Sequence, residues 1–150
     1  MKRAIELALD NVRTSRGGPF GAVVVHEGRI VGEGVNRVTA TNDPTAHAEM
    51  VATRAAARAL GTFRLVGCEL YASCEPCPMC LGAAYWARID RVWFGANRCD
   101  AADAGFDDAH LYQELALPPQ RRTLPIAQLM REEALAALDE WRRLPDRIPY

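Results

Sequence analysis

The sequence predicts an α/β protein, a three-layer α/β/α sandwich with a mixed central sheet. One observation is a β-hairpin pattern: residues 20–26 are apolar and β-branched, Glu27-Gly28 is typical of a two-residue turn, and residues 29–36 supply the partner strand. A second is the alternation of helical and strand patterns after the hairpin. Because 150 residues suffice for one sizeable core, we expect residues 1–150 to form a single domain.

The first helix precedes the hairpin. Ile5, Leu9 and Val12 recur at spacings of four and three residues, which predicts an amphipathic helix. The segment Gly17-Gly18-Pro19 combines residues that end helices, so we expect the helix to stop before the first strand.

Helices and strands then alternate to the end of the chain. Residues 46–60 are strongly helix-forming and stop at Gly61, and either Thr45 or Asp43 is expected to cap this helix. The later expected elements are strands at 68–73 and 91–95, helices at 78–88, 109–117 and 130–144, and a short strand or extended segment at 123–126. The proline-rich stretch 118–122 is the expected hinge.

The most informative motif is His47-Ala48-Glu49, followed by Pro76-Cys77-Pro78-Met79-Cys80. One imidazole and two thiolates are good zinc ligands, and catalytic zinc sites keep three protein ligands and one open position for water. His and Glu two residues apart reach one site only near a helix start, and Cys residues three apart share a helix face. We therefore expect one Zn²⁺ bound by His47, Cys77 and Cys80, with Glu49 as general acid and base.

The cysteines also fit two weaker interpretations. A lone Cys-x-x-Cys is typical of a redox pair, but such a pair would leave His47-Ala48-Glu49 without a role. Cys74, Cys77 and Cys80 have a spacing similar to an iron–sulfur motif, but Ala83 stands where a fourth cysteine would be needed. The zinc interpretation is the one that uses both motifs.

Composition indicates a soluble globular protein. Charged residues make up 25%, and no apolar run approaches the ~20 residues of a membrane span. Glu6 and Asp10 leave no apolar core for a signal peptide, so we expect no membrane partner and a cytoplasmic location. The cysteines not assigned to zinc, Cys68, Cys74 and Cys99, are expected to be reduced.

The charge balance argues against a stable nucleic-acid partner. The formal net charge is −1, whereas proteins that grip nucleic acid usually present a basic face. The last expected helix also mixes arginine with glutamate and aspartate. The expected partner is a small-molecule substrate.

The motifs resemble a known family. The pattern H-x-E…P-C-x-x-C is shared by the zinc nucleobase deaminases of the cytidine deaminase-like superfamily. The segments 41–49 and 73–83, the sequence Ala104-Gly105-Phe106-Asp107-Asp108 and a terminal Tyr closely resemble the small zinc-dependent bacterial guanine deaminases. The resemblance covers essentially the whole chain, and its last two parts are the ones specific to guanine deaminases. It implies hydrolysis of guanine to xanthine and ammonia within purine catabolism.

The resemblance also implies roles for individual residues. Glu49 shuttles protons, Asn36 holds the base and Phe20 stacks on it; Ala48 and Asp108 contact the substrate, Asp108 with a catalytic role, and Tyr150 closes the pocket. Taken singly, each of these residues also fits an ordinary structural role, so the assignments rest on their joint occurrence. Glu75 and His110 are further candidates without an assigned role.

The resemblance further implies a homodimer. Dimers of this family exchange their C-terminal segments, so we expect residues from about 123 to 150 to be exchanged and Tyr150 to close the partner's pocket. The stiff Pro118-Pro119 pair fits a hinge for such an exchange.

Three alternative functions stay open on the sequence. One is a tRNA adenosine deaminase, which predicts a basic surface and an open pocket mouth. Another is a deaminase of a different free base or aminotriazine, such as cytosine or ammeline. The third is a non-catalytic zinc-binding module, against which an intact Glu49 argues because a structural site needs no acid or base.

Overall fold

The computed structural model describes residues 1–106 and 108–149, apart from the side chain of Asp108. The chain forms two compact units, Met1–Tyr112 and Gln113–Tyr150. The elements that begin in the first unit are α1 Lys2–Arg13, β1 Gly21–His26, β2 Arg29–Val35, α2 Val38–Thr41, α3 Ala48–Leu60, β3 Cys68–Cys74, α4 Pro78–Trp86, β4 Arg91–Ala96, α5 Arg98–Asp103 and α6 Asp108–Ala116.

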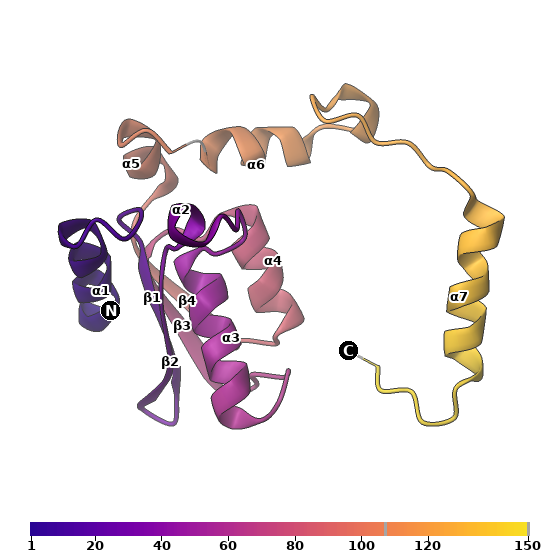
Figure 1. The fold of residues 1–150 in the computed structure, drawn as a ribbon, viewed down its shortest axis with the longest axis horizontal. Coiled ribbons are helices and arrows are strands. Elements are labelled where there is room, and N and C mark those ends of the chain that lie inside the picture. Colours follow the sequence, from indigo (N-terminus) through magenta and orange to yellow (C-terminus); the bar gives the residue numbers. More distant parts are fainter. Residues whose placement is uncertain (107, 150) are drawn as a thin grey trace. The chain divides into compact units, whose positions relative to one another are not determined.

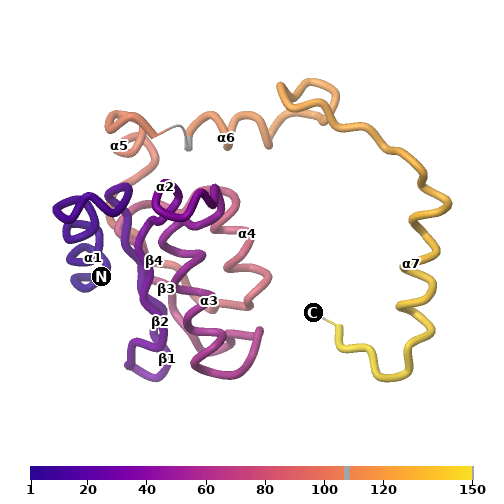
Figure 2. Tube along the Cα trace, in the orientation of Figure 1, coloured from indigo at the N-terminus to yellow at the C-terminus, as the bar shows by residue number. Residues whose placement is uncertain are grey.

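The first unit is built on a mixed four-stranded sheet with the order β2-β1-β3-β4. Strand β1 runs antiparallel to both β2 and β3, and β4 runs parallel to β3. Helix α1 covers one face, and α3 and α4 cover the other (Figure 1). The chain path through the β1–β2 hairpin, with positive φ at Glu27 and Gly28, can be followed in Figure 2. The predicted α/β/α sandwich with a mixed sheet is confirmed.

Glycines let α3 lie directly against β2. A Cβ on Gly32 would clash with the Ala52 carbonyl and lie 2.7 Å from the Ala56 nitrogen. One turn earlier in α3, a Cβ on Gly34 would likewise clash with the Ala48 carbonyl and with the Ala52 nitrogen. The resulting core between sheet and helix consists of small and medium side chains, and its largest buried members are Leu65, Leu70 and Val24.

The predicted first helix is present, but the expected apolar face is not the buried one. Ile5, Leu9 and Val12 are 43–48% exposed, whereas Ala4 and Ala8 are buried. The cause lies in β1, where a Cβ on Gly21 would come within 2.6 Å of the Ala8 nitrogen. The helix backbone therefore rests on the strand, and only alanine-sized side chains fit between them.

Helix α3 starts at Ala48, two residues later than the expected start at residue 46. Its N-cap is His47, with extended backbone and no side-chain capping bond. Neither Thr45 nor Asp43 caps it, because the Asp43 carboxylate accepts hydrogen bonds from the Thr45 N–H and hydroxyl. Two short helices were not predicted: α2, and α5, which begins with an Asn97–Asp100 capping box. The other strands and helices of this unit lie within a few residues of their predicted ranges.

The second unit contains a 3-10 turn, Pro119–Arg121, and helix α7, Arg131–Arg143. The structure places no strand at 123–126, and the boundary between the units falls inside α6, before the expected hinge. No residue of α7 is buried, and Leu138 and Trp141 are exposed by 51% and 40%. Among the described residues, no helix has the length and apolar character that crossing a membrane requires.

The close contact between β2 and α3 leads to a stability prediction. Replacing Gly32 with Ala (Gly32→Ala) forces a methyl group into the α3 backbone, and such overpacking costs ~1–3 kcal/mol. Gly82→Ala is the matched control, since its Cβ meets nothing within 4 Å and alanine favours a helix by about 1 kcal/mol. Urea unfolding should show lower stability for the first variant and equal or higher stability for the second. Equal destabilisation would contradict the packing argument.

Candidate metal centre and substrate pocket

Two helix N-termini bring the expected metal ligands together. His47 is the N-cap of α3 and Cys77 is the N-cap of α4, and both have extended backbone. Neither side chain caps its own helix, which leaves the imidazole and the thiol available for the site. Cys80 lies in the first turn of α4, where the positive end of the helix dipole favours a thiolate.

The donor atoms have the separations that one zinc ion requires. The His47, Cys77 and Cys80 ligand atoms all lie within 4.8 Å of one another. The two Sγ atoms are 3.7 Å apart, and Cys77 Sγ is 3.6 Å from His47 Nδ1. Ligands at tetrahedral angles on zinc, with bonds of ~2.3 Å to sulfur and ~2.0–2.1 Å to nitrogen, would be ~3.8 Å and ~3.6 Å apart. The donor set and its spacing therefore fit zinc.

Without a bound metal, the site favours an ionised Cys77 and a protonated Cys80. Contact with Cys80 lowers the pKa of the Cys77 thiol to about 4; burial opposes this shift, and contact with His47 adds to it. Contact with Cys77, together with burial, raises the pKa of Cys80. One thiolate is thus present at neutral pH, and a bound divalent cation would remove the proton from the second thiol.

Glu49 lies beside the ligands as a buried carboxyl group. It is 8% exposed and sits in the first turn of α3. Burial raises the pKa of Glu49 to about 7, while its own backbone N–H and the neighbouring imidazole favour the ionised form. A divalent cation at the ligands would favour it further. A buried carboxyl group at this position can both accept a proton from water and return it.

A cavity of about 250 Å³ opens next to Glu49. It is lined by five of the predicted site residues, namely Phe20, Asn36, His47, Glu49 and Cys77. Ligand sites for drug-sized molecules usually occupy ~300–1,000 Å³, so this cavity suits a smaller molecule. Its lining combines aromatic faces with a few polar groups.

Asn36 and Phe20 form one wall of this cavity. Asn36 is 8% exposed, and its Oδ1 accepts a hydrogen bond from the Val38 N–H at 3.3 Å. Its backbone carbonyl accepts a hydrogen bond from Asn11 Nδ2 at 2.9 Å, which fixes the end of β2. Phe20 packs edge-on against Phe106, with ring centroids 4.7 Å apart. Both predicted substrate residues are thus held in defined positions.

Several lining residues were not among the predicted site residues. They are Gly18, Val38, Thr39 and Phe106. Glu75, a candidate without an assigned role on the sequence, also lines the cavity. Phe106 lies inside the Ala-Gly-Phe-Asp-Asp segment, so that motif was the signal available for it. Val38 and Thr39 come from the unpredicted helix α2, and no sequence signal marked them.

Glu75 is held by an ion pair at the cavity wall. Its carboxylate contacts the Arg98 guanidinium at 2.8 Å and accepts the Arg98 backbone N–H at 3.0 Å. Arg98 lies 4.0 Å over the Tyr112 ring, and the Tyr112 hydroxyl donates to the Pro76 carbonyl at 2.8 Å. This chain of contacts fixes the loop that carries Cys77.

The remaining predicted site residues are placed differently or lie outside the description. The Ala48 side chain is buried in the core, and Ala48 is not among the residues that line the cavity. The Asp108 side chain and Tyr150 lie outside the described residues. Cys74 is buried but is not part of the metal-ligand group, and none of the five cysteines forms a disulfide.

Metal analysis tests the ligand set. Cys80→Ala removes one of three donors and should lose most of its zinc, because zinc affinity depends on the full ligand set. Cys74→Ala is the matched control: its thiol is also buried in the same segment, and it should keep one zinc per chain. Equal zinc loss in both variants would rule out the assignment.

Comparisons with known proteins agree with this geometry. The cytidine and deoxycytidylate deaminase zinc-binding region matches residues 1–96. The guanine deaminase of Bacillus subtilis (strain 168) is 50% identical over all 150 residues, which cover 96% of its length. Its crystal structure superposes with a TM-score of 0.95 over 99% of this chain and 95% of that chain.

More distant relatives share the fold and the zinc region. A structure of guanine deaminase from Nitrosomonas europaea is 30% identical, with a TM-score of 0.67 over 93% of this chain and 80% of that chain. A tRNA-specific adenosine deaminase of Agrobacterium fabrum is 48% identical over 79 residues, which are 53% of this chain and 52% of that protein. With its zinc ligands, its buried carboxyl group and its fold, the chain belongs to the zinc-dependent cytidine and deoxycytidylate deaminase family.

Proposed function

We propose that this protein is an aminohydrolase that converts guanine and water into xanthine and ammonia. The observation that carries this is the similarity to a guanine deaminase along the whole chain, including the part after residue 96 that the family's zinc region does not cover. The similarity to the tRNA-specific deaminase is confined to about half of the chain. The small cavity, with its two aromatic side chains, suits a single free base.

The proposed mechanism follows from the site. Zinc, when bound by His47, Cys77 and Cys80, supplies a Lewis acid that makes water nucleophilic near neutral pH. The Glu49 carboxylate accepts the proton that water loses as its oxygen bonds to C2 of guanine. Glu49 then delivers that proton to the adjacent ring nitrogen. It next takes the proton of the hydroxyl group now on C2 and passes it to the exocyclic amine, so that the C2–N bond breaks, a carbonyl forms at C2 and ammonia leaves. Because Glu49 is buried, bulk solvent does not compete for these protons.

Substrate recognition is proposed for the cavity wall. Phe20 and Phe106 offer an aromatic surface for the purine ring, and the Asn36 amide offers hydrogen bonds to its polar edge. Asp108 accepts hydrogen bonds from the amine-bearing edge of guanine and assists catalysis there. Tyr150, an aromatic residue with a polar tip, closes the pocket.

Mutation of Glu49 tests the catalytic role. Glu49→Gln keeps the shape of the side chain but removes the titrating group, so turnover of guanine should fall by at least ~10²–10⁴-fold. Zinc content should stay at the wild-type level. Glu27→Gln, in the exposed hairpin turn, is the control and should behave like wild type. Near-normal turnover of Glu49→Gln with full zinc would refute the assignment.

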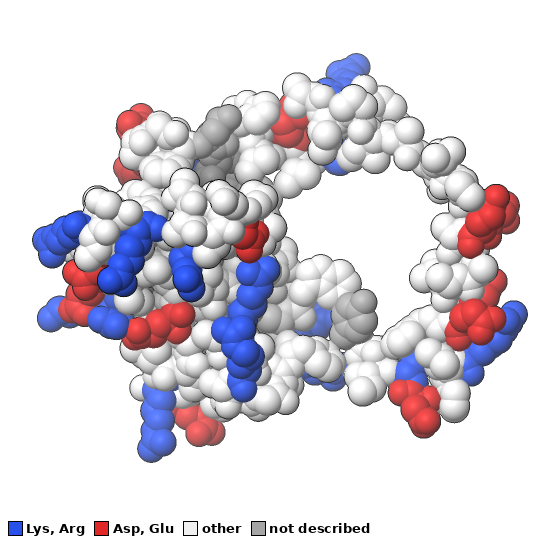
Figure 3. Space-filling model, viewed as in Figure 1, with Lys and Arg blue, Asp and Glu red and all other residues white. Residues whose placement is uncertain are grey.

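A substrate panel tests the specificity. Ammonia release should be compared for guanine, guanosine, adenine, cytosine, cytidine, ammeline and tRNA, and guanine should have the highest kcat/KM. A site built on buried hydrogen bonds rejects analogues with the wrong donor pattern by up to ~10⁴–10⁵-fold. The alternative of tRNA deamination is disfavoured by the net charge of −1 and by the mixture of acidic and basic side chains on the face seen in Figure 3. A higher kcat/KM for tRNA or cytidine would overturn the proposal.

A homodimer is part of the proposal. The first unit exposes large apolar side chains along α4 and β4: Tyr85 at 72%, Trp86 at 63%, Trp93 at 43% and Phe94 at 48%. Large apolar side chains exposed on consecutive elements often mark protein interfaces. We infer that residues 123–150 are exchanged between two cytoplasmic subunits and that Tyr150 reaches the pocket of the partner.

Removal of the last residue tests this arrangement. Deleting Tyr150 should leave zinc content unchanged, because the ligands lie within residues 47–80, and should cut guanine turnover sharply by opening the pocket. Tyr150→Phe keeps the aromatic cover and should lose much less. Sedimentation should show a dimer for all three proteins. A monomer, or full activity of the deletion variant, would contradict the proposal.

A further inference from the structure

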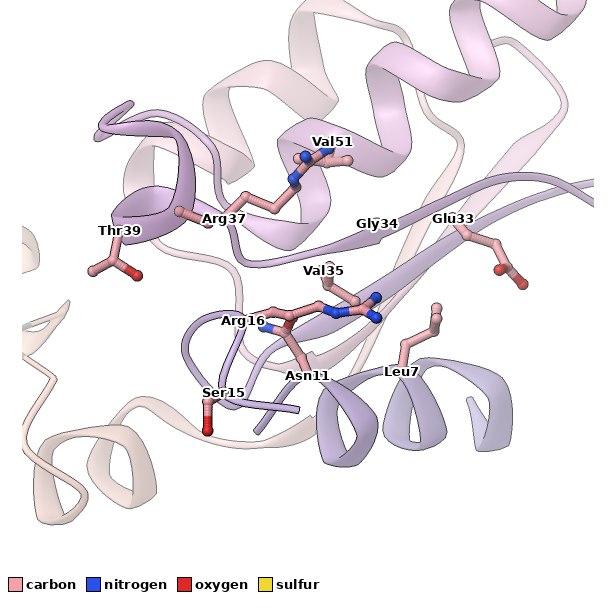
Figure 4. A pocket seen from close by; sticks show the side chains of 11 residues that line it. Leu7, Asn11, Ser15, Arg16, Glu33, Gly34, Val35, Arg37, Thr39 and Val51 are labelled. Atoms are coloured by element: carbon pink, nitrogen blue, oxygen red, sulfur yellow. The ribbon is translucent and has the colours of Figure 1, made fainter. Parts of the chain in front are cut away.

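A second and larger hollow, of about 780 Å³, lies along the free edge of the sheet; it shares Thr39 with the substrate pocket, but none of the metal ligands lines it. Its floor is the end of β2, and its walls come from α1 on one side and from α2 and α3 on the other (Figure 4). We name it the edge groove, defined by the lining residues Leu7, Asn11, Arg16, Val35, Arg37 and Val51. Nothing in the deamination reaction uses it.

Among the described residues, the backbone of β2 has hydrogen-bonding groups without partners that face the edge groove. The Asn36 N–H donates to the Phe20 carbonyl, and the Gly21 N–H points the other way, to the Ser73 hydroxyl. Backbone N–H and carbonyl groups alternate sides along a strand. The groups of Gly32 and Gly34 therefore pair with β1, and the N–H and carbonyl groups of Glu33 and Val35 point away from β1, toward the free edge. Sheets usually protect such an edge with a covering segment or an inward charge. Here the outward N–H and carbonyl groups of Glu33 and Val35 face the hollow.

The side chains around the edge groove are basic. Among the described residues, neither Arg16 nor Arg37 has an ion pair or a side-chain hydrogen bond. In Figure 4 the Arg16 side chain lies toward α1, and the Arg37 side chain lies toward Val51 of α3. The carboxylate in the lining, Glu33, is already neutralised by two hydrogen bonds from Arg3, at 2.7 and 2.8 Å. The groove therefore presents net positive charge around an apolar floor.

We propose that the edge groove binds an extended acidic peptide segment of a partner protein, which adds to β2 as a further strand. Main-chain hydrogen bonds to Glu33 and Val35 would hold the peptide backbone, as in other cases of β-strand addition. Acidic side chains of the peptide pair with Arg16 and Arg37, and β-branched side chains contact Leu7 and Val51. The free edge favours a peptide over a compact anion, because only an extended chain matches alternating donors and acceptors.

Peptide selection tests the occupant. Random peptides displayed on phage are selected on the zinc-loaded protein and, in parallel, on the Arg16→Ala/Arg37→Ala double variant. Wild type should enrich sequences that combine β-branched residues with Asp or Glu on both faces of an extended strand, and the variant should not. No enrichment over the variant overturns the proposal.

Binding measurements then separate backbone pairing from charge. For a labelled enriched peptide, fluorescence anisotropy should show at least about tenfold weaker binding when alternate peptide amides are N-methylated, and about tenfold weaker binding to the double variant. Arg29→Ala, on the same strand but outside the groove, is the matched control and should bind as wild type. Zinc content and guanine turnover of the double variant should equal those of wild type, which excludes misfolding.

A different occupant would give different results. If N-methylation has no effect while GTP or inorganic triphosphate displaces the peptide, the edge groove is an anion site. If the double variant changes the sedimentation behaviour of the protein alone, the occupant is a second copy of this chain. Either outcome overturns the proposal.

Discussion

The active site depends on the direct contact between β2 and α3. Because Gly32 and Gly34 carry no side chain, the α3 backbone lies against the strand, and the N-terminus of α3 is fixed beside the end of β2. His47 and Glu49 thereby lie on the same cavity as Asn36, although no local sequence pattern connects them. Helix α4 follows β3, the strand next to β1, and supplies Cys77 and Cys80 at its N-terminus. The metal ligands therefore meet because α3 and α4 both begin at the same end of the sheet.

The sequence predicted the parts of the site that carry local patterns. The ligands His47, Cys77 and Cys80 follow from donor type and spacing, and the structure brings them together. The sandwich fold follows from the hairpin turn and the alternation of elements. These features are determined over a few residues, so they are visible without tertiary information.

Features set by tertiary packing were not predicted. The apolar spacing of Ile5, Leu9 and Val12 identified a helix but not its buried face, because the contact with Gly21 admits only alanine-sized side chains. The cap of α3 was assigned to Thr45 or Asp43 on propensity, whereas the N-cap is a metal ligand whose side chain has another use. Phe106 reaches the cavity from a distant turn by packing on Phe20, a contact that neither residue's local sequence indicates.

A buried amide connects the edge groove with the substrate pocket. Asn11 is 3% exposed, and its Nδ2 donates to the Gly18 carbonyl at 2.8 Å and to the Asn36 carbonyl at 2.9 Å. Gly18 and Asn36 line the substrate pocket, while Asn11 lines the edge groove. Among the described residues, Asn11 Oδ1 has no hydrogen-bond partner, and burying a polar atom in that state costs ~1–3 kcal/mol. An apolar residue would avoid that cost but would release both carbonyls. The side chain is therefore explained by the positions it gives to Gly18 and Asn36, since both carbonyls would otherwise lose their hydrogen-bond donor.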